Sequence, residues 1–496
     1  MSEAFVSDTK HDLYLLRVEG QNFDSVIYDT HDLSTMAGGS YLLAAIPRGV
    51  EAVLRRLEEE GRLRTHRTIQ SAASTGLFAV CSGSNGIAPL LSAVKRRLAG
   101  PFFRHFTVSV EIAEIGGAAV DVDASGALAI PDAALRAIDP GLLDRLAAEA
   151  KWTQMRAPNT AIPEGNPEAC KACCEDHVRP AIGAGKLARS PSVAARRRMG
   201  KDYRWQSGGK PERIAAAQSF DEMTGHSEKK RWNGRLAVIC IDGKGFTGLR
   251  QRLCKDGESL KWFSDELARL QEAFHANLMD GWRKATASDR YFFPYFPSAE
   301  DRQPGRVPGQ LLRLQRLVSA GDDSTYLMPA WLAWEFLEKF FSHPWILNHR
   351  VEGNEAAEPQ EIQLSFRAGV VICHAKAPIH PIHDLAQKLE SVVAAKDGRS
   401  MQNPIAYEVL KSFDFVGAGI EEYRKQKRAC LEPHEALLDG KEIANLECRL
   451  KELKEKASSG EIKTPLRWHD TLARLKDPKF QKGDLYHLSQ WRDYIF

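Results

Sequence analysis

Short apolar runs alternate along the chain with longer amphipathic stretches, and their order recurs. The first third of the chain predicts a strand, a helix, two strands, a helix and a strand, in the stretches DLYLLRVE (12–19), AGGSYLLAAIPRGVEAVLRRLEEEGR, THRTIQSAAS, GLFAVCS, IAPLLSAVKRRLA and HFTVSVEIAEI. This order is that of the ferredoxin-like, or split βαβ, domain.

Residues 235–410 show the same order again. Strands, helices and a closing helix–strand pair are predicted over RLAVICI, WFSDELARLQEAFHANLMDGW, LLRLQRLVSA, STYLM, AWLAWEFLEKFF, FRAGVVICHA, PIHDLAQKLESVVAAK and PIAYEVL. The two series differ in sequence, but the repeated order predicts a duplicated domain. The predicted fold class is therefore α+β, with two βαββαβ domains.

Four segments follow from these patterns. The two repeated series lie in residues 1–149 and 235–410. Residues 150–234 are rich in Pro, Gly, Ser and basic residues, which predicts an irregular insert. Residues 411–496 are charged and helical in pattern, which predicts a small α-helical C-terminal domain.

Composition narrows the class of protein. The chain has 496 residues, 43% hydrophobic and 27% charged, with a net charge of +3, so charge alone argues for no nucleic-acid partner. No window approaches the roughly 18 apolar residues of a membrane helix, and the N-terminus lacks a signal-peptide pattern. Most of the nine cysteines are isolated in apolar settings, as Cys81, Cys240 and Cys373 are, which is typical of reduced buried thiols. We expect a cytoplasmic protein without a membrane partner.

Three carboxylates carry the candidate chemistry. RLAVICIDGKGFTGL ends a buried strand at Asp242, and VSAGDDSTYLM places Asp322 and Asp323 on a turn between two strands. The first strand of a split βαβ sheet lies beside the hairpin of the next two, so the three side chains should converge. Like charges repel unless a cation neutralises them. Mg²⁺ or Mn²⁺ fits such an oxygen-rich set, to which the Gly243 carbonyl could add a ligand.

The plainer interpretation of these residues stays open. Gly-Asp is a favoured hairpin turn, and a strand-end aspartate often caps a helix. The occurrence of both on the right elements in the right order favours a two-ion site for phosphoryl transfer.

The motifs of residues 235–410 resemble a known family. RLAVICIDGKGFTGL, VSAGDDSTYLMP and LSFRAGVVICHAKAPIHPIHDLAQKLESVVAAK are similar to the catalytic palm of the large polymerase/cyclase subunit of type III CRISPR effector complexes. That family shares its fold with GGDEF and class III nucleotidyl cyclase domains. It shows a strand-end Asp-Gly, a GGDD turn, a strand ending in His-x-Lys-x-Pro and a helix closing with Ala-Lys.

The first half of the chain resembles the family's second, degenerate palm. Its opening RVEGQNFDSVIYDTHDLSTMAGGSYLL is similar to the family's first strand and glycine-rich helix entry. Glu19 stands where the first metal-binding aspartate would be. We place the counterpart of the GGDD turn at CSGSNGIAP, which has no carboxylate pair.

The resemblance implies roles for individual residues. Catalysis and metal binding would fall to Asp242, Asp322 and Asp323, with Gly243 as a further metal ligand. Nucleotide binding would fall to Gly321, Ser324, Lys376 and Lys396. Both lysines have an alternative interpretation as solvated surface residues.

The cluster EACKACCEDHVRPA is a candidate zinc site. Its ligands would be Cys170, Cys173, Cys174 and His177, since Cys-x-x-Cys is half of a zinc site and the family carries a zinc module between its palms. The expected second Cys-x-x-Cys pair is missing, so Cys174, His177 or the distant His226 would have to complete the tetrahedron. Reduced thiols left from a lost site are the alternative.

Two other features have weaker implications. The basic run with Arg196, Arg197, Arg198, Lys201, Tyr203, Arg204 and Trp205 could bind RNA or form a solvated loop. The family's larger members carry an N-terminal HD nuclease, and this chain has the dipeptides His11-Asp12 and His31-Asp32. Both occur without the separate helical domain that would precede the first palm in such members. We interpret them as coincidence and the chain as a short form without that nuclease.

The sequence thus predicts a metal-dependent nucleotidyltransferase that converts nucleoside triphosphates into cyclic or linear oligonucleotides. The resemblance implies ATP as substrate, oligoadenylate as product and a messenger role in anti-phage defence. The cofactors would be two Mg²⁺ or Mn²⁺ ions and a structural Zn²⁺. One alternative is a catalytically silent RNA-binding scaffold subunit of a CRISPR-type complex, and another is a cyclase acting on single nucleotides. Base, ring size, homo-oligomerisation and the need for RNA or other effector-complex subunits stay open.

Overall fold

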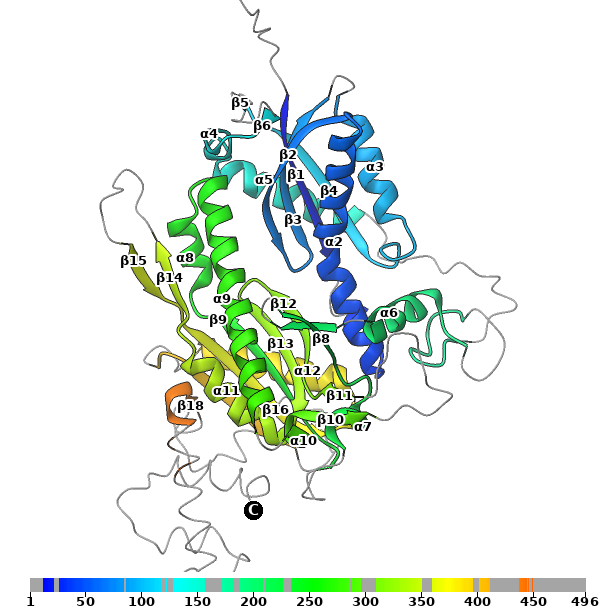
Figure 1. The fold of residues 1–496 in the computed structure, drawn as a ribbon, viewed down its shortest axis with the longest axis vertical. Helices are drawn as coiled ribbons and strands as arrows, with labels where there is room; N and C mark the ends of the chain where they lie inside the picture. Colours follow the sequence, from blue (N-terminus) through cyan, green and yellow to red (C-terminus); the bar gives the residue numbers. More distant parts are fainter. Residues whose placement is uncertain are drawn as a thin grey trace, which may run out of the picture. The chain divides into compact units, whose positions relative to one another are not determined.

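The structure is a computed structural model, and the chain falls into two compact units (Figure 1). The first unit comprises residues 1–202, 245–269 and 319–321, and the second comprises residues 203–244, 270–318 and 322–496. The structure describes residues 12–21, 26–83, 86–116, 121–122, 128–156, 172–181, 188–202, 204–207, 210–225, 233–285, 288–295, 309–349, 359–395, 401–410, 437–443, 445 and 448. The predicted helical C-terminal domain lies almost entirely outside these residues.

The first unit is built on a four-stranded sheet in the order β2-β3-β1-β4, with every neighbouring pair antiparallel. Its strands and helices alternate as β1 (Leu13–Gln21), α2 (Leu33–Glu59), β2 (Leu63–Ala72), β3 (Thr75–Ser82), α3 (Ala88–Leu98) and β4 (Thr107–Glu114). The remaining elements of this unit are β5 (Asp121–Val122), β6 (Leu128–Ala129), α4 (Asp132–Arg136), α5 (Pro140–Arg156), α6 (Pro191–Asp202) and α8 (Phe246–Leu253). All six elements of the first predicted series are present.

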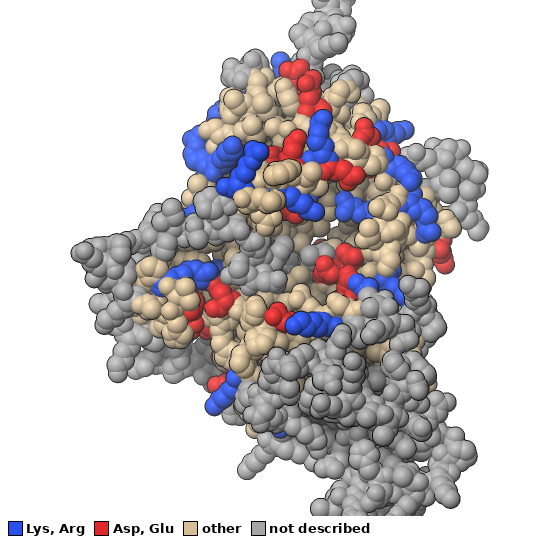
Figure 2. All heavy atoms as spheres, turned by 180° about the vertical axis from the view of Figure 1, so that it is seen from behind, with Lys and Arg blue, Asp and Glu red and all other residues tan. Residues whose placement is uncertain are grey.

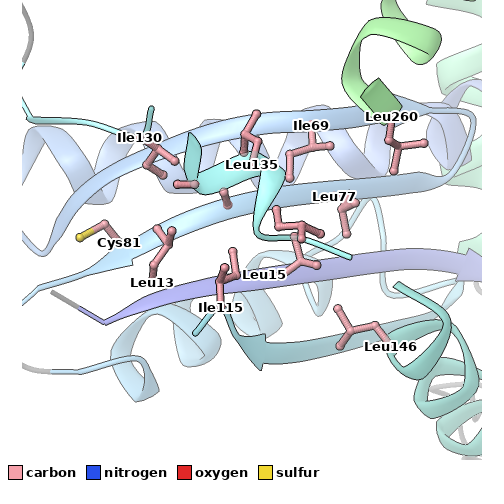
Figure 3. Packing of buried hydrophobic residues seen from close by; sticks show 13 residues of the cluster. Leu13, Leu15, Ile69, Leu77, Cys81, Ile115, Ile130, Leu135, Leu146 and Leu260 are labelled. Carbon is pink, nitrogen blue, oxygen red and sulfur yellow. The ribbon is translucent and has the colours of Figure 1, made fainter. Parts of the chain in front are cut away.

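Both faces of this sheet are covered. Helix α2 packs against β1, β2 and β3 on one face. On the other face, alternate residues such as Leu13, Leu15 and Leu77 meet Leu135 of α4 and Leu146 of α5 in a buried apolar cluster (Figure 3). Period-two alternation along the strands produces these two apolar faces.

The basic run of the insert forms ion pairs within the first unit. Arg196 of α6 is fully buried and donates to Asp29 at 2.8 Å, and Arg197 pairs with Asp32. Asp32 is also the N-cap of α2, where it accepts from the Thr35 amide at 2.9 Å. Ion pairs within the protein thus give Arg196 and Arg197 a structural role, while RNA binding by the basic run stays a prediction. The same contacts explain the His31-Asp32 dipeptide as a helix cap.

The second unit contains a six-stranded sheet in the order β12-β13-β9-β16-β17-β18. Its principal elements are β9 (Arg235–Gly243), α9 (Gly257–Lys284), β12 (Gln315–Ala320), β13 (Asp323–Pro329), α11 (Ala333–Ser342), β16 (Phe366–His374), α12 (Ile379–Ala395) and β17 (Pro404–Val409). Residues 257–269 of α9 and residues 319–320 of β12 belong to the first unit. The shorter elements are β7 (Arg204–Ser207), β8 (Lys210–Ala215), α7 (Phe220–Thr224), α10 (Ser288–Tyr291), β10 (Phe292–Tyr295), β11 (Gly309–Leu312), the 3₁₀ turn Ala330–Leu332, β14 (Ile346–His349), β15 (Gln360–Gln363), β18 (Leu438–Asp439) and the 3₁₀ turn Gly440–Glu442. The predicted second series is present, and the α+β class is confirmed.

Different layers cover the two faces of the second sheet. On one face Tyr326 of β13 contacts His275 of α9 and Phe336 of α11 in an aromatic core. On the other face α12 packs against β9, β16 and β17. Residues of β9 alternate between the two layers and are nearly all buried, which explains the continuous apolar run of this strand.

A glycine sets how closely α12 approaches the sheet. A Cβ on Gly369 of β16 would lie 1.9 Å from the Ala386 carbonyl oxygen and 2.6 Å from the Glu390 amide nitrogen. Only glycine fits this close approach. The backbone of α12 therefore lies directly against β16, with Glu390 over the strand.

Charges of both signs lie on the face drawn in Figure 2. Lysine and arginine side chains lie interspersed with aspartate and glutamate on the face drawn in Figure 2. Among the described helices, none combines the length and apolar character needed to cross a membrane.

Candidate active site

Three carboxylates meet at the end of β9. Asp242 is the penultimate residue of β9, and Asp323 opens the neighbouring strand β13, whose Ser324 pairs with Ile241. Ligand oxygens of Asp242, Asp322 and Asp323 all lie within 4.8 Å of one another. The antiparallel pairing of β9 with the β12–β13 hairpin creates this cluster, because it places the strand end beside the turn.

The hairpin turn has the backbone that its sequence favours. Gly321 has φ of 67°, in the left-handed region, and a Cβ there would meet no atom within 4 Å. The position therefore selects glycine for its backbone conformation, while the space beside it stays open. This conformation presents Asp322 and Asp323 at the tip of the hairpin.

Two further charged residues adjoin the carboxylates. Arg367 of β16 pairs in register with Asp242 of β9, and its guanidinium forms an ion pair with the Asp242 carboxylate. The same guanidinium forms an ion pair with Glu390 of α12. Strand alternation puts Asp242, Asp323 and Arg367 on the face that α12 covers. The site is thus four carboxylates and one arginine, on one face of the sheet.

Sequence analysis missed Arg367 and Glu390, although both left a signal. Arg367 is a charged residue two positions before Gly369 in a strand that is otherwise buried. Glu390 follows Ala386 by one helical turn and so shares the helix face that touches Gly369. A charge on the buried face of a strand and another on the buried face of the next helix indicate an ion pair.

The electrostatics reflect crowding of like charges. The pKa of Asp323 is raised to about 8, first because the surrounding protein displaces water from its carboxyl group, and then because of Asp242, Asp322 and Glu390. Burial also raises the pKa of Glu390, against the lowering effect of Arg367. Such carboxylates are held together at a free-energy cost that a bound cation would offset.

The donor set fits a hard divalent cation. It consists of carboxylate oxygens within reach of one position, which suits Mg²⁺ or Mn²⁺. Gly243, next to Asp242 at the end of β9, remains a predicted carbonyl ligand. Among the described residues, this is the sole group of three or more His, Cys, Asp or Glu side chains that meet in this way.

The predicted nucleotide-binding residues do not all join this cluster. His374 pairs with Arg235 while Arg367 pairs with Asp242, so Lys376 lies beyond the opposite end of the same strand pair. At about 3.3 Å per residue, the seven residues from Arg367 to His374 span roughly 23 Å. Lys376 therefore lies well away from the carboxylates along the sheet, and its contact with a triphosphate stays a prediction. Lys396 lies outside the described residues.

Ser324 lies next to the carboxylates in sequence but on the other face. It is buried, and its hydroxyl hydrogen-bonds with Tyr326, which belongs to the aromatic layer. Strand alternation separates it from Asp323.

The predicted zinc ligands are only partly within the described residues. Cys170 lies outside them. Cys173 is fully buried with Ala181, Ala188 and Val193, whereas His177 is exposed with φ of 56°. The described members do not form a group of three metal-ligating side chains. Zinc binding stays a prediction that depends on Cys170.

Comparisons with known proteins find similarity only among solved structures. No protein-family model and no curated protein matches the chain. The crystal structure of Csm1 in T. onnurineus is 12% identical over 98% of this chain and 69% of that chain, with a TM-score of 0.45. A Csm1–Csm4 cassette in complex with cA4 is 12% identical over 94% of this chain and 65% of that one, with a TM-score of 0.43. For the cassette in complex with AMPPNP, at 12% identity and a TM-score of 0.43, the chain spans 54% of its length. The function proposed below therefore rests on the chain's own residues.

The first unit has a counterpart of the site without its carboxylates. Glu19 of β1 pairs with Thr75, the first residue of β3, just as the end of β9 adjoins Asp323. The turn before Thr75 holds Ala73, whose φ of 50° resembles that of Gly321, and Ser74. The degenerate turn is thus Ala73-Ser74-Thr75. Our placement of it at CSGSNGIAP is wrong, because that segment follows β3 instead of joining β2 to β3.

This counterpart is closed by its own contacts. The Ser74 hydroxyl donates to the Gly20 carbonyl at 2.8 Å, and Ser74 is buried. Glu19 pairs with Arg17 at 2.8 Å. Among the described residues, the site of the first unit therefore has one carboxylate, already paired, and no acidic cluster.

The crowding of carboxylates predicts that stability depends on pH. An unfolded aspartate titrates near 3.8, whereas Asp323 in the folded protein holds its proton to about pH 8. The folded state thus binds more protons between these values, and the free energy of unfolding should fall as pH rises through this window. In EDTA, the denaturation midpoint of the unaltered protein should drop between about pH 5 and about pH 8. We expect a smaller drop in Asp323→Asn, which lacks this titrating group. Equal drops in both proteins would contradict the crowding of Asp323.

Proposed function

We propose that the protein is a metal-dependent nucleotidyltransferase that joins nucleoside triphosphates into cyclic or linear oligonucleotides. The observation that carries this proposal is the meeting of Asp242, Asp322 and Asp323 within 4.8 Å at one end of a sheet. ATP as substrate, oligoadenylate as product and a messenger role in anti-phage defence come from the sequence resemblance to the type III CRISPR polymerase/cyclase subunits. A cytoplasmic location is also part of this proposal.

The residues have distinct parts in this reaction. The 3′-hydroxyl of one nucleotide would attack the α-phosphorus of the next, forming a P–O bond while the bond to the leaving pyrophosphate breaks and the hydroxyl proton passes to solvent. The three carboxylates would hold two divalent cations, and bound Mg²⁺ or Mn²⁺ would activate the hydroxyl and neutralise charge on the phosphates. The left-handed turn at Gly321 fixes where Asp322 and Asp323 project.

We further propose that both units contain ferredoxin-like palms, one active and one degenerate. The shared orders β2-β3-β1-β4 and β12-β13-β9-β16 support this, as does antiparallel pairing in each sheet. The second unit keeps the acidic residues, whereas the first has Ala73, Ser74 and Thr75 at the matching turn.

One observation favours the catalytically silent scaffold as a second candidate. Lys376, the lysine of the His-x-Lys motif, lies at the end of the β9–β16 pair away from the carboxylates. If neither Lys376 nor Lys396, which lies outside the described residues, reaches the nucleotide phosphates, the palm would be a poor catalyst, unless another cation near the carboxylates takes that part.

Product analysis separates the two candidates. The purified protein is incubated with each nucleoside triphosphate and Mg²⁺ or Mn²⁺, beside the variant Asp322→Ala/Asp323→Ala, and the products are weighed by mass spectrometry. We expect oligonucleotide masses from the unaltered protein and none from the variant, and the mass also distinguishes oligomers from cyclic mononucleotides. If the unaltered protein forms no product, also with target RNA added, while Asp322→Ala/Asp323→Ala keeps its function in cells, the scaffold is the better description.

A further inference from the structure

Arg367 contacts two carboxylates at once. It lies directly across from Asp242 on the antiparallel strand and forms ion pairs with Asp242 and with Glu390. A planar guanidinium presents donors in several directions, so it can serve two acceptors, which a lysine ammonium does less well. Asp242 and Glu390 thus share one cation, which stays paired with Glu390 if Asp242 is withdrawn.

The fold holds this triad in place from three elements. Asp242 comes from β9, Arg367 from β16 and Glu390 from α12. The missing side chain of Gly369 lets α12 lie against β16, which brings Glu390 over Arg367. The side chains of Arg367, Asp242 and Glu390 are 25%, 19% and 12% exposed, so solvent screens these contacts only in part.

Two cations therefore compete for the Asp242 carboxylate. Its proximity to Asp322 and Asp323 makes it a ligand for a divalent cation, whereas Arg367 is a cation already in contact with it. Two cations that share one carboxylate weaken each other's binding, and this coupling is reciprocal. Glu390 changes the balance, because it offers Arg367 another carboxylate when the metal takes Asp242.

We propose that Arg367 is a built-in counter-ion that competes with the divalent cation for Asp242, and that Glu390, which it already contacts, is the acceptor that keeps the guanidinium paired once the metal has taken Asp242. This inference rests on the proposed metal site. It assigns positioning roles to two residues outside the acidic motif. It also keeps a positive charge beside the site after metal binding, where a nucleotide triphosphate would need one.

Mn²⁺ affinity, measured by electron paramagnetic resonance without nucleotide, tests the proposal. We expect Arg367→Gln to bind Mn²⁺ more tightly, on the order of tenfold, because the competitor is gone. We expect Glu390→Gln to bind more weakly by a similar factor, because Arg367 is then left with Asp242 alone. In Arg367→Gln/Glu390→Gln the loss caused by Glu390→Gln should disappear, since it acts through the arginine.

Controls make each outcome decisive. Lys388→Gln removes one positive charge from an exposed position of the same helix and should leave Mn²⁺ affinity within about twofold. If both single variants weaken Mn²⁺ binding alike, or if the effect of Glu390→Gln persists without Arg367, the competition is overturned while the metal site stands. The double variant keeps the net charge of the triad, so it tests the proposal even where one single variant folds poorly. If Asp322→Ala/Asp323→Ala binds Mn²⁺ as the unaltered protein does, the metal site and the proposed function fail together.

Discussion

Replacing Asp242 with asparagine should reduce product formation by about a hundredfold or more. Asparagine keeps the shape of the side chain but removes the charge that both Asp323 and Arg367 interact with. Because the metal ligands come from only three carboxylates, the loss of one removes a third of their charge. The rate of oligonucleotide formation at saturating nucleoside triphosphate and Mn²⁺ measures the effect.

Asp384→Asn provides the matched control for this prediction. Asp384 lies on α12 near His380, with which it pairs at 3.7 Å, at the end of the helix remote from Glu390. The same chemical change there should leave the rate within about twofold, since a partly exposed ion pair contributes little. A rate for Asp242→Asn close to that of Asp384→Asn would mean that the carboxylate cluster does not carry the chemistry.

Introducing alanine at Gly369 should lower the free energy of unfolding by about 2–3 kcal/mol. The new Cβ would lie 1.9 Å from the Ala386 carbonyl oxygen, and backbone of both β16 and α12 must move to relieve the clash. For a unit of this size the melting temperature should fall by roughly 5–10 °C. Scanning calorimetry or urea denaturation measures the loss.

The same substitution should also disturb the site. Moving α12 away from β16 separates Glu390 from Arg367, so Mn²⁺ affinity should fall as it does in Glu390→Gln. Gly281→Ala is the matched control: it lies in helix α9 with no atom within 4 Å of the new Cβ. That change should stabilise the protein by up to about 1 kcal/mol. If both variants melt alike, the tight contact between α12 and β16 is not a determinant of stability.

Local sequence patterns determined much of this fold. The alternation of apolar runs predicted the strands and helices of both units, because burial on one or two faces of a sheet leaves a period that is visible along the chain. Asp242, Asp322 and Asp323 were identifiable for the same reason. They follow a buried strand and a glycine turn, and the βαββαβ order brings such positions together.

Pairing between distant strands decided what the sequence left open. Lys376 lies away from the carboxylates because β16 runs antiparallel to β9, so that the residue facing Asp242 is Arg367. Once the register of β9 and β16 is known, residue numbers alone place Arg367 beside Asp242 and Lys376 at the other end. That register is determined by contacts across the sheet, which the sequence does not show. In the first unit, the turn between β2 and β3 at Ala73 and Ser74 was missed for the same reason, because the sequence alone did not show where the two strands end.

Only the tertiary structure gave charged residues their partners. Arg196 and Arg197 belong to a run that looks solvated in sequence, yet they pair with Asp29 and Asp32 from a distant segment. Glu390 joins the site because Gly369 lets a helix approach a strand. A periodic sequence pattern indicates which face of a helix or strand is buried. An ion pair depends on which faces of two different elements pack together, and close packing between segments far apart in the chain determines this.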